Sequence, residues 1–191
     1  MGQAYITDKV YDKTNFAQNP LEKGEYEGCT FTNCDFSNAD FTDIKFTECS
    51  FTGCNMSLVK LNRTALRDIK FKDCKLLGLH FENCTDLGLS FSFENCMLNH
   101  SVFYRTKIKK TSFKSCQLKE VDFSNCDLTQ AVFDNCDLNM SVFVSTILEK
   151  ADFRTSYNYS LDPAVNKVKK AKFSLQGIPG LLDKYDIEIE K

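Results

Sequence analysis

The sequence contains no tryptophan, three prolines and two histidines, His80 and His100, among 191 residues. Two histidines give little support to a catalytic centre or a metal site built on several imidazoles. A membrane-spanning helix needs about eighteen consecutive apolar residues. No segment of the sequence approaches that length. The first residues also lack the basic and apolar regions of a secretory signal. We therefore expect a cytoplasmic protein that does not enter a membrane.

Charge of one sign is not in excess either. The chain carries 24 basic and 26 acidic side chains, for a net charge of −2. This balance excludes a generally basic nucleic-acid-binding protein, so we expect no direct nucleic acid partner. Neither a glycine-rich phosphate loop nor a metal motif is found in the sequence. We expect no catalytic residues, no metal and no cofactor, and hence a protein that is not an enzyme.

What the sequence has instead is a repeat of five residues. A large apolar residue stands at every fifth position from Tyr26 to Phe81, and again, two positions out of phase, from Phe93 to Phe153. A period of five fits neither an α-helix nor a β-strand. The residue two positions before each centre is mostly small, as at Cys29 and Ala131. One large and one small inward residue describe one side of a four-sided coil of twenty residues.

The twenty-residue period sorts the large residues into columns. One column is phenylalanine throughout: Phe31, Phe51, Phe71, Phe93, Phe113, Phe133 and Phe153. A second column is mostly aliphatic: Phe36, Met56, Leu76, Leu98, Leu118 and Leu138. We predict that each core residue contacts its equivalents in the coils above and below, because stacked repeats bury one continuous core.

Units such as CDFSN, ADFTD, VDFSN and CDLTQ resemble those of the pentapeptide-repeat family over about residues 11–158. The resemblance implies an all-β fold, a right-handed quadrilateral β-helix, closed by a short C-terminal helix and strand. We expect the β-helix over 1–158, with an N-terminal cap over about 1–25. Residues 159–191 are then expected to form the C-terminal cap and a dimerisation segment.

Ten cysteines raise the alternatives of disulfides or zinc, and their spacing decides between them. Six form a ladder at intervals of 20 or 22 residues: Cys34, Cys54, Cys74, Cys96, Cys116 and Cys136. The other four also occupy the small inward position of their repeats. No CxxC pair occurs, and parallel side chains of successive coils oppose the torsion of a disulfide. We predict reduced, buried thiols that pack as small hydrophobic groups.

Two segments depart from the repeat. The stretch TDLGLSFS, residues 85–92, is two residues longer than the frame allows and is predicted to bulge outward, either as a tolerated insertion or as a contact loop. Near the C-terminus, GLLDKY favours one or two helical turns, and residues 186–190 alternate as a strand does.

The open end of a β-helix requires a cap. In the quinolone-resistance (Qnr-like) members of the family, a similar segment joins two rods, which implies a homodimer through Leu181, Leu182, Tyr185, Ile187 and Ile189. Capping within a monomer is the alternative.

Charge varies along the chain in four zones, with net charges of −5 (residues 1–59), +6 (60–114), −5 (115–162) and +2 (163–191). Solvated faces explain such zones without any function, but segregated charge also steers partners. The candidates for recognition by acidic groups are Asp35, Asp40, Asp122, Asp127, Asp134 and Asp137. If the basic zone carries recognition instead, the candidates are Lys107, Lys109 and Lys110.

Two functions follow. The resemblance to Qnr-like members, carried also by KTNF and GCTFTNCDFSNADF, implies a DNA mimic that binds a type II topoisomerase (DNA gyrase or topoisomerase IV) and protects it from quinolones. The alternative is a structural or scaffolding module that binds another protein through its charged faces.

Overall fold

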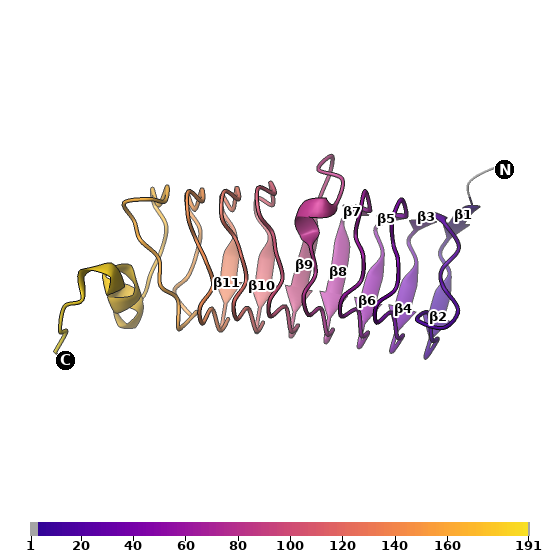
Figure 1. The fold of residues 1–191 in the computed structure, drawn as a ribbon, viewed down its shortest axis with the longest axis horizontal. Helices are drawn as coiled ribbons and strands as arrows, with labels where there is room; N and C mark the ends of the chain where they lie inside the picture. Colours follow the sequence, from indigo (N-terminus) through magenta and orange to yellow (C-terminus); the bar gives the residue numbers. More distant parts are fainter. Residues whose placement is uncertain (1–3, 191) are drawn as a thin grey trace.

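A computed structural model describes residues 4–190 as a rod of successive coils, with the two ends of the chain at opposite ends of the rod (Figure 1). A coil takes twenty residues, or twenty-two where the insertion lies, and short strands of three or four residues form two of its sides. The strands are β1 (Ala4–Thr7), β2 (Val10–Asp12), β3 (Gly24–Glu27), β4 (Thr30–Thr32), β5 (Lys45–Thr47), β6 (Ser50–Thr52), β7 (Ala65–Arg67), β8 (Ile69–Lys72), β9 (Phe91–Glu94), β10 (Ser112–Lys114) and β11 (Val132–Asp134).

Two parallel sheets run along the rod. One has four strands in the order β1-β3-β5-β7, and we call its side of the rod face 1. The other has seven strands in the order β11-β10-β9-β8-β6-β4-β2, and we call its side face 2. Partners along face 2 are mostly twenty residues apart, as in Phe31 opposite Phe51 and Phe113 opposite Phe133. The sheets therefore have the register that the twenty-residue period predicted.

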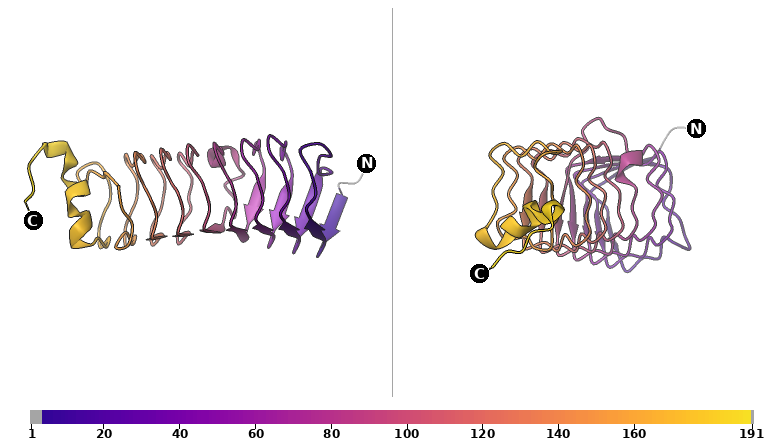
Figure 2. Two further views of the ribbon diagram at one scale, coloured as in Figure 1. Left: turned by 90° about the horizontal axis from the view of Figure 1, so that it is seen from below. Right: turned by 60° about the vertical axis from the view of Figure 1, so that its left-hand side comes forward.

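Isolated parallel bridges form the two remaining sides. Face 3 carries the row Asn15, Asp35, Asn55, Lys75, Met97, Gln117, Asp137 and Tyr157. Face 4 carries the pair Asp40 and Lys60 and the row His80, Val102, Asp122 and Val142. Seen obliquely toward its C-terminal end, the rod has a four-sided outline (Figure 2). The chain thus forms the quadrilateral β-helix that the repeat indicates.

The core fills the rod along its whole length. Neighbouring rings of the phenylalanine column stack with centroids 4.6 to 5.3 Å apart, from Phe31 on Phe51 to Phe133 on Phe153. Rings of adjacent columns meet edge to face, as Phe103 and Phe123 do against Phe113. The predicted phenylalanine column is confirmed, and apolar burial at every coil stabilises the rod.

Each corner of the coil contains a residue in the left-handed region. Twenty-five residues other than glycine have φ between 49° and 65°, and most are five positions apart. A five-residue side needs such a residue because the chain must turn sharply without losing the hydrogen bonds between coils. Within residues 4–190, Asn and Asp occupy ten of the coil's corners and tolerate this conformation best among residues with a side chain.

All ten cysteines are free and buried, as their spacing predicted. Several thiols donate to the carbonyl oxygen 23 residues earlier, for example Cys126 Sγ to Phe103 O at 2.8 Å and Cys136 Sγ to Phe113 O at 3.4 Å. Burial raises the pKa of the Cys49 thiol to about 12 and that of Cys126 to about 11. Cys49 and Cys126 are therefore neutral thiols that pack in the core.

The coil extends beyond both boundaries expected from the sequence. Strand β1 pairs with β3, and β2 with β4, so most of the segment expected as an N-terminal cap follows the path of a coil from Ala4 onward. At the other end, bridges join Ile147 to Lys167 and Asp152 to Lys172. Phe173 stacks on Phe153 at 5.4 Å and continues the core column.

The C-terminal segment then leaves the coil as two 3-10 helices, η2 (Leu175–Leu181) and η3 (Asp183–Tyr185). Leu181 packs against the last core residues, so η2 covers the end of the rod (Figure 2). The strand expected over residues 186–190 is not formed. Asp186 turns into the left-handed region at φ 49°, and no strand of the described residues pairs with the isoleucines that follow.

The predicted insertion bulges from the coil between β8 and β9, after the short 3-10 helix η1 (Phe81–Asn83) (Figure 1). Gly88, at φ +77°, lies against the side chain of Arg67, and Leu87 is 76% exposed at the tip. Ile69 pairs directly with Phe91, 22 residues later, so face 2 continues without a break. The sheet of face 1, in contrast, ends at β7.

Candidate interaction surfaces

The six acidic candidates do not share one surface. Asp35 and Asp137 lie on face 3, Asp40 and Asp122 on face 4, and Asp134 on face 2. Asp127 bridges Lys107 in a segment between the face 4 row and β10, which places it on face 1. The four candidates from Asp122 to Asp137 therefore point to four sides of a single coil.

Five of these aspartates hold the coil's own backbone. Asp35, Asp40, Asp122, Asp127 and Asp137 each accept a hydrogen bond from the backbone N–H two residues later, at 2.8 to 3.2 Å. Such bonds are the usual reason for Asp in turns. Hydrogen bonds from Thr42 hold the pKa of Asp40 below its ordinary value. Burial acts to raise the pKa of Asp127, but hydrogen bonds from Thr129 and Lys109 hold it below its ordinary value.

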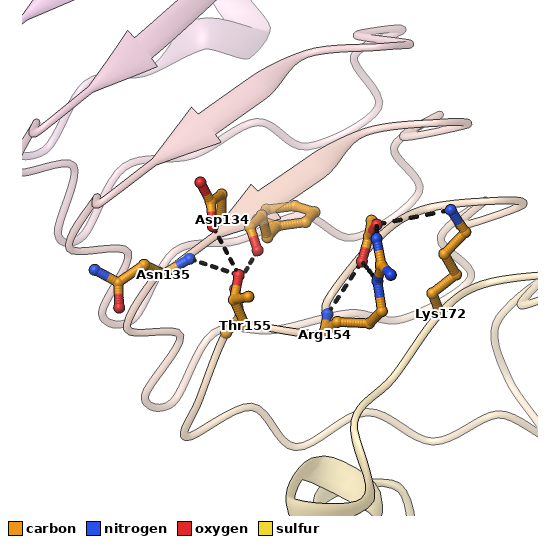
Figure 3. A network of polar contacts seen from close by, with 8 residues as sticks. Asp134, Asn135, Arg154, Thr155 and Lys172 are labelled. Carbon is orange, nitrogen blue, oxygen red and sulfur yellow. Dashed lines mark hydrogen bonds and ion pairs between the residues drawn. The ribbon is translucent and has the colours of Figure 1, made fainter.

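Asp134 belongs to a polar network on face 2 (Figure 3). Its carboxylate accepts from Thr155 Oγ1 at 2.9 Å, and the same hydroxyl accepts from the N–H of Asn135 at 2.9 Å. Next to it, Asp152 is held by Arg154 at 2.7 Å and by Lys172 at 3.8 Å. Asp152 is thus neutralised by cations of its own coil and of the next one, whereas the contact of Asp134 is a neutral hydroxyl of the next coil.

The alternative basic candidates do share a surface. Lys107, Lys109 and Lys110 all lie on face 1, in the coil that follows the insertion, and all three are exposed. Lys109 forms an ion pair with Asp127 at 3.2 Å. Lys109 and Lys110 also line an open groove of about 320 Å³ beside the insertion, together with Lys70, Ser90 and Phe91.

Face 1 also has an acidic end, which the sequence analysis missed. Five carboxylates lie on its first four coils: Asp8, Glu25, Glu27, Glu48 and Asp68. Backbone hydrogen bonds from Asp8 N–H to Glu27 O and from Glu48 N–H to Arg67 O fix their order along the rod. Lys45 pairs with Glu25 at 2.5 Å, and Tyr5 donates to Glu27. We call this set the acidic surface; its one signal in the sequence was the pair Glu48 and Asp68, which are twenty positions apart.

The C-terminal candidates divide into two groups. Leu181 contacts the core of its own chain, whereas Tyr185, Ile187 and Ile189 are 59%, 54% and 50% exposed. Leu182, Ile187 and Ile189 line an open groove of about 360 Å³ with Pro179. The exposed apolar side chains therefore gather at the end of the rod, on the outer side of the cap.

Over residues 4–190, no group of three or more His, Cys, Asp or Glu side chains is arranged to hold a metal ion. Across the same part of the chain, the helices are too short and too polar to cross a membrane.

Comparisons with known proteins agree with the fold. The coil architecture, with four five-residue sides and parallel ladders between coils, defines a β-helix of pentapeptide repeats. The family profile described as the pentapeptide repeat region matches residues 25–92 and 89–157. The chain therefore belongs to the pentapeptide-repeat family. A search of curated proteins finds no match to it.

Two solved structures illustrate the likeness. HetL, a pentapeptide repeat protein involved in heterocyst differentiation regulation from the cyanobacterium Nostoc sp. strain PCC 7120, is 13% identical, with a TM-score of 0.55 over 91% of this chain and 87% of that one. Full-length QnrB1, a plasmid-mediated fluoroquinolone resistance protein, is 19% identical, with a TM-score of 0.46 over 97% of this chain and 100% of that one. At 13% identity, the likeness to HetL concerns the fold alone.

Proposed function

We propose that this protein is a non-enzymatic interaction module that binds a partner protein on the outside of its rod. The acidic surface carries this proposal. It presents carboxylates on successive coils about 4.8 Å apart, on a scaffold whose filled core keeps them in place. Lys45 and Arg67 lie on the same sheet, but carboxylates outnumber them there. A preformed surface with an excess of one charge steers an oppositely charged partner and fixes its register.

The specific partner that we propose is a type II topoisomerase, DNA gyrase or topoisomerase IV, with the acidic surface standing in for the phosphates of DNA. The sequence resemblance to Qnr-like members supports this partner. The position of the carboxylates supports it as well, because Asp8, Glu27, Glu48 and Asp68 are exposed and lie along one side of the rod. The binding is then mainly Coulombic and weakens as salt rises.

A scaffolding role with a different protein is the second candidate, and an apolar patch favours it. Four side chains are exposed near the C-terminal end of face 4: Met140 (67%), Val142 (44%), Val144 (48%) and Val165 (49%). Ser145 N–H donates to Val165 O, which places Val165 beside Val144 in the next coil. Apolar groups of this kind form the centre of protein–protein interfaces. Its partner would bind with little dependence on salt.

A binding assay with purified DNA gyrase, combined with a supercoiling assay with and without ciprofloxacin, tests the specific partner. We expect binding at low salt, and we expect Asp8→Asn, Glu27→Gln and Glu48→Gln together to weaken it on the order of tenfold or more. The matched control removes three exposed carboxylates from other faces, through Asp12→Asn, Asp73→Asn and Glu120→Gln. No measurable binding to gyrase or topoisomerase IV, or equal loss in both variants, rejects the topoisomerase proposal.

We also propose that two copies join through the C-terminal groove lined by Leu182, Ile187 and Ile189. The side chains of Ile187 and Ile189 are about half exposed, although they lie next to each other beyond the cap. Covering them by the same surface of a second copy gives a closed, two-fold dimer. Static light scattering of the unaltered chain measures this directly, and a monomer mass contradicts it.

A further inference from the structure

The C-terminal half of face 1 gathers seven lysines that are scattered along the sequence. They come from three coils: Lys107, Lys109 and Lys110, then Lys150, then Lys167, Lys169 and Lys170. Bridges in the order Lys107, Asp127, Ile147 and Lys167 align these coils with the one between them. Hydrogen bonds from Lys110 N–H to Thr129 O and from Lys150 N–H to Lys169 O align the neighbouring row. We call this set the lysine face.

The lysine face is strongly positive. All seven lysines are exposed, whereas the face 1 segments of these coils, 107–110, 127–130, 147–150 and 167–170, include two carboxylates, Asp127 and Glu149. Within the described residues, Lys109 alone among the seven forms an ion pair, with Asp127. The other six ammonium groups are held on one side of a rigid rod without a carboxylate within ion-pair distance in that part of the chain.

We propose that the lysine face binds the phosphate backbone of duplex nucleic acid, without preference for sequence. This goes beyond the protein-binding role above and does not depend on it. It also departs from the expectation of no nucleic acid partner, because that expectation rested on the net charge of −2, which does not show that lysines gather on one side of the rod. A protein partner normally needs an apolar centre at its interface, but the large exposed hydrophobic side chains lie outside the lysine face. Interfaces with DNA are more polar and more positive than interfaces between proteins. The composition of the face therefore favours phosphate groups.

The residue types also indicate how the nucleic acid is held. The segments 107–110, 127–130, 147–150 and 167–170 contain no aromatic residue on which an unpaired base could stack. They contain no arginine either, the residue that reads guanine by two parallel hydrogen bonds. Lysines act as point charges on phosphates. A duplex backbone, contacted through charge alone, is the ligand that these side chains fit.

The dimensions are suited to a few phosphates. Three steps between coils separate Lys107 from Lys167, or about 14 Å at the usual spacing between strands. Duplex DNA carries one charge per about 1.7 Å of its axis. A face of this length spans several phosphates on the two strands, so about four simultaneous contacts are expected. The acidic surface adjoins this face, because its last residue, Asp68, lines the same groove as Lys109 and Lys110.

Fluorescence anisotropy with a labelled 20-base-pair duplex tests the proposal on the full chain. With about four contacts, the logarithm of the binding constant should fall with the logarithm of salt concentration at a slope of about −3.6. Changing Lys107, Lys110 and Lys169 to Gln should weaken binding at least tenfold at low salt. The same change should reduce the slope by about 2 to 3, because each lost contact removes about 0.9.

The matched control removes the same charge elsewhere, through Lys13→Gln on face 2, Lys60→Gln on face 4 and Lys75→Gln on face 3, all exposed positions. The proposal expects this variant to bind the duplex within about threefold of the unaltered chain. Equal weakening in the two variants overturns it, because net charge and not the lysine face would then govern binding. It is also overturned if the duplex does not bind at low salt, or if a poly-glutamate peptide of equal charge binds more tightly than the duplex. Far-UV circular dichroism of both variants confirms that the coils are intact.

Discussion

Replacing Phe113 by Ala tests the core most directly, because this ring is fully buried in the middle of the phenylalanine column. It stacks on Phe93 at 5.2 Å and on Phe133 at 4.9 Å. Phe103 and Phe123 also meet it edge to face at 6.1 and 5.9 Å. The substitution therefore removes four aromatic contacts and opens a cavity between two rings.

The expected loss is about 3 to 5 kcal/mol of unfolding free energy, the usual cost of Phe to Ala in a core. Area gives a similar figure, since burial of at least about 150 Å² for an aromatic side chain is worth roughly 4 kcal/mol at 25 cal/mol/Å². The cavity cannot close easily, because β10 is hydrogen-bonded to β9 on one side and to β11 on the other. We therefore expect a value in the upper part of the range.

Urea unfolding measures the change, followed by far-UV circular dichroism and by the fluorescence of the seven tyrosines, since the chain has no tryptophan. With a slope of about 2.5 kcal/mol per molar urea, the midpoint should fall by about 1 to 2 M. Lys114→Ala is the matched control, because Lys114 neighbours Phe113 in β10 and points outward. Its loss should be about 0.5 kcal/mol or less. A loss below about 1 kcal/mol for Phe113→Ala would refute the assignment of this column to the core.

Three further predictions concern the assembly, the thiols and the turn aspartates. Leu182→Glu with Ile187→Glu should convert the proposed dimer to a monomer with intact coils, because charge would enter an apolar contact. Light scattering measures the mass and circular dichroism checks the coils, and an unchanged mass would contradict the interface. A thiol reagent should label few or none of the ten cysteines in the native protein and all ten after denaturation, whereas a disulfide on a non-reducing gel would contradict the buried thiols. The folded chain raises the pKa of Cys126 to about 11. The contribution of this thiol to stability should therefore be complete below the unfolded thiol pKa of about 8.5 and should be lost as pH rises toward 11. The urea midpoints at pH 7.5 and pH 10 should differ less in Cys126→Ala than in the unaltered chain. Burial opposes the ionisation of Asp137, but hydrogen bonds from Asn158, Lys119 and Asn139 hold its pKa below the ordinary value. Its stabilisation should therefore be present above about pH 4 and lost as pH falls further. Asp137→Ala should cost about 1 to 3 kcal/mol of unfolding free energy at pH 7 and flatten this acid dependence, and an unaltered urea midpoint would contradict the turn role.

The residues that point into the core of the rod could be predicted from the sequence. Phe113 and Cys136 were placed in the core from spacing alone, and both are buried. The reason is local and steric, since a five-residue side offers two inward positions and repeats them regardless of what lies elsewhere in the chain. The same regularity gave the twenty-residue register of face 2, because equal coils stack residue over residue.

The ends of the rod were harder to predict. Residues 186–190 alternate as a strand does, yet no strand forms, because alternation becomes a strand only where another edge supplies hydrogen bonds. Ile187 and Ile189 remain exposed instead. The first coil, from Ala4, was nevertheless open to prediction, because the five-residue spacing of large apolar residues continues back from Tyr26 through Leu21, Phe16, Tyr11 and Ile6. In the structure, Tyr11 stacks on Phe31 and Phe16 on Phe36.

The surfaces were decided by the tertiary structure alone. Residues 115–162 have a net charge of −5 in the sequence, but several of their aspartates face different sides and bind backbone N–H groups. Lys107 and Lys167 are sixty positions apart, and winding brings them to the same side of the rod. The sequence by itself determined what is buried, because each five-residue unit repeats the same choice of inward residues. Which charges meet depends on how many residues the chain uses in each turn, and the insertion before Phe91 changes that number once, so only the folded coil shows the acidic surface and the lysine face.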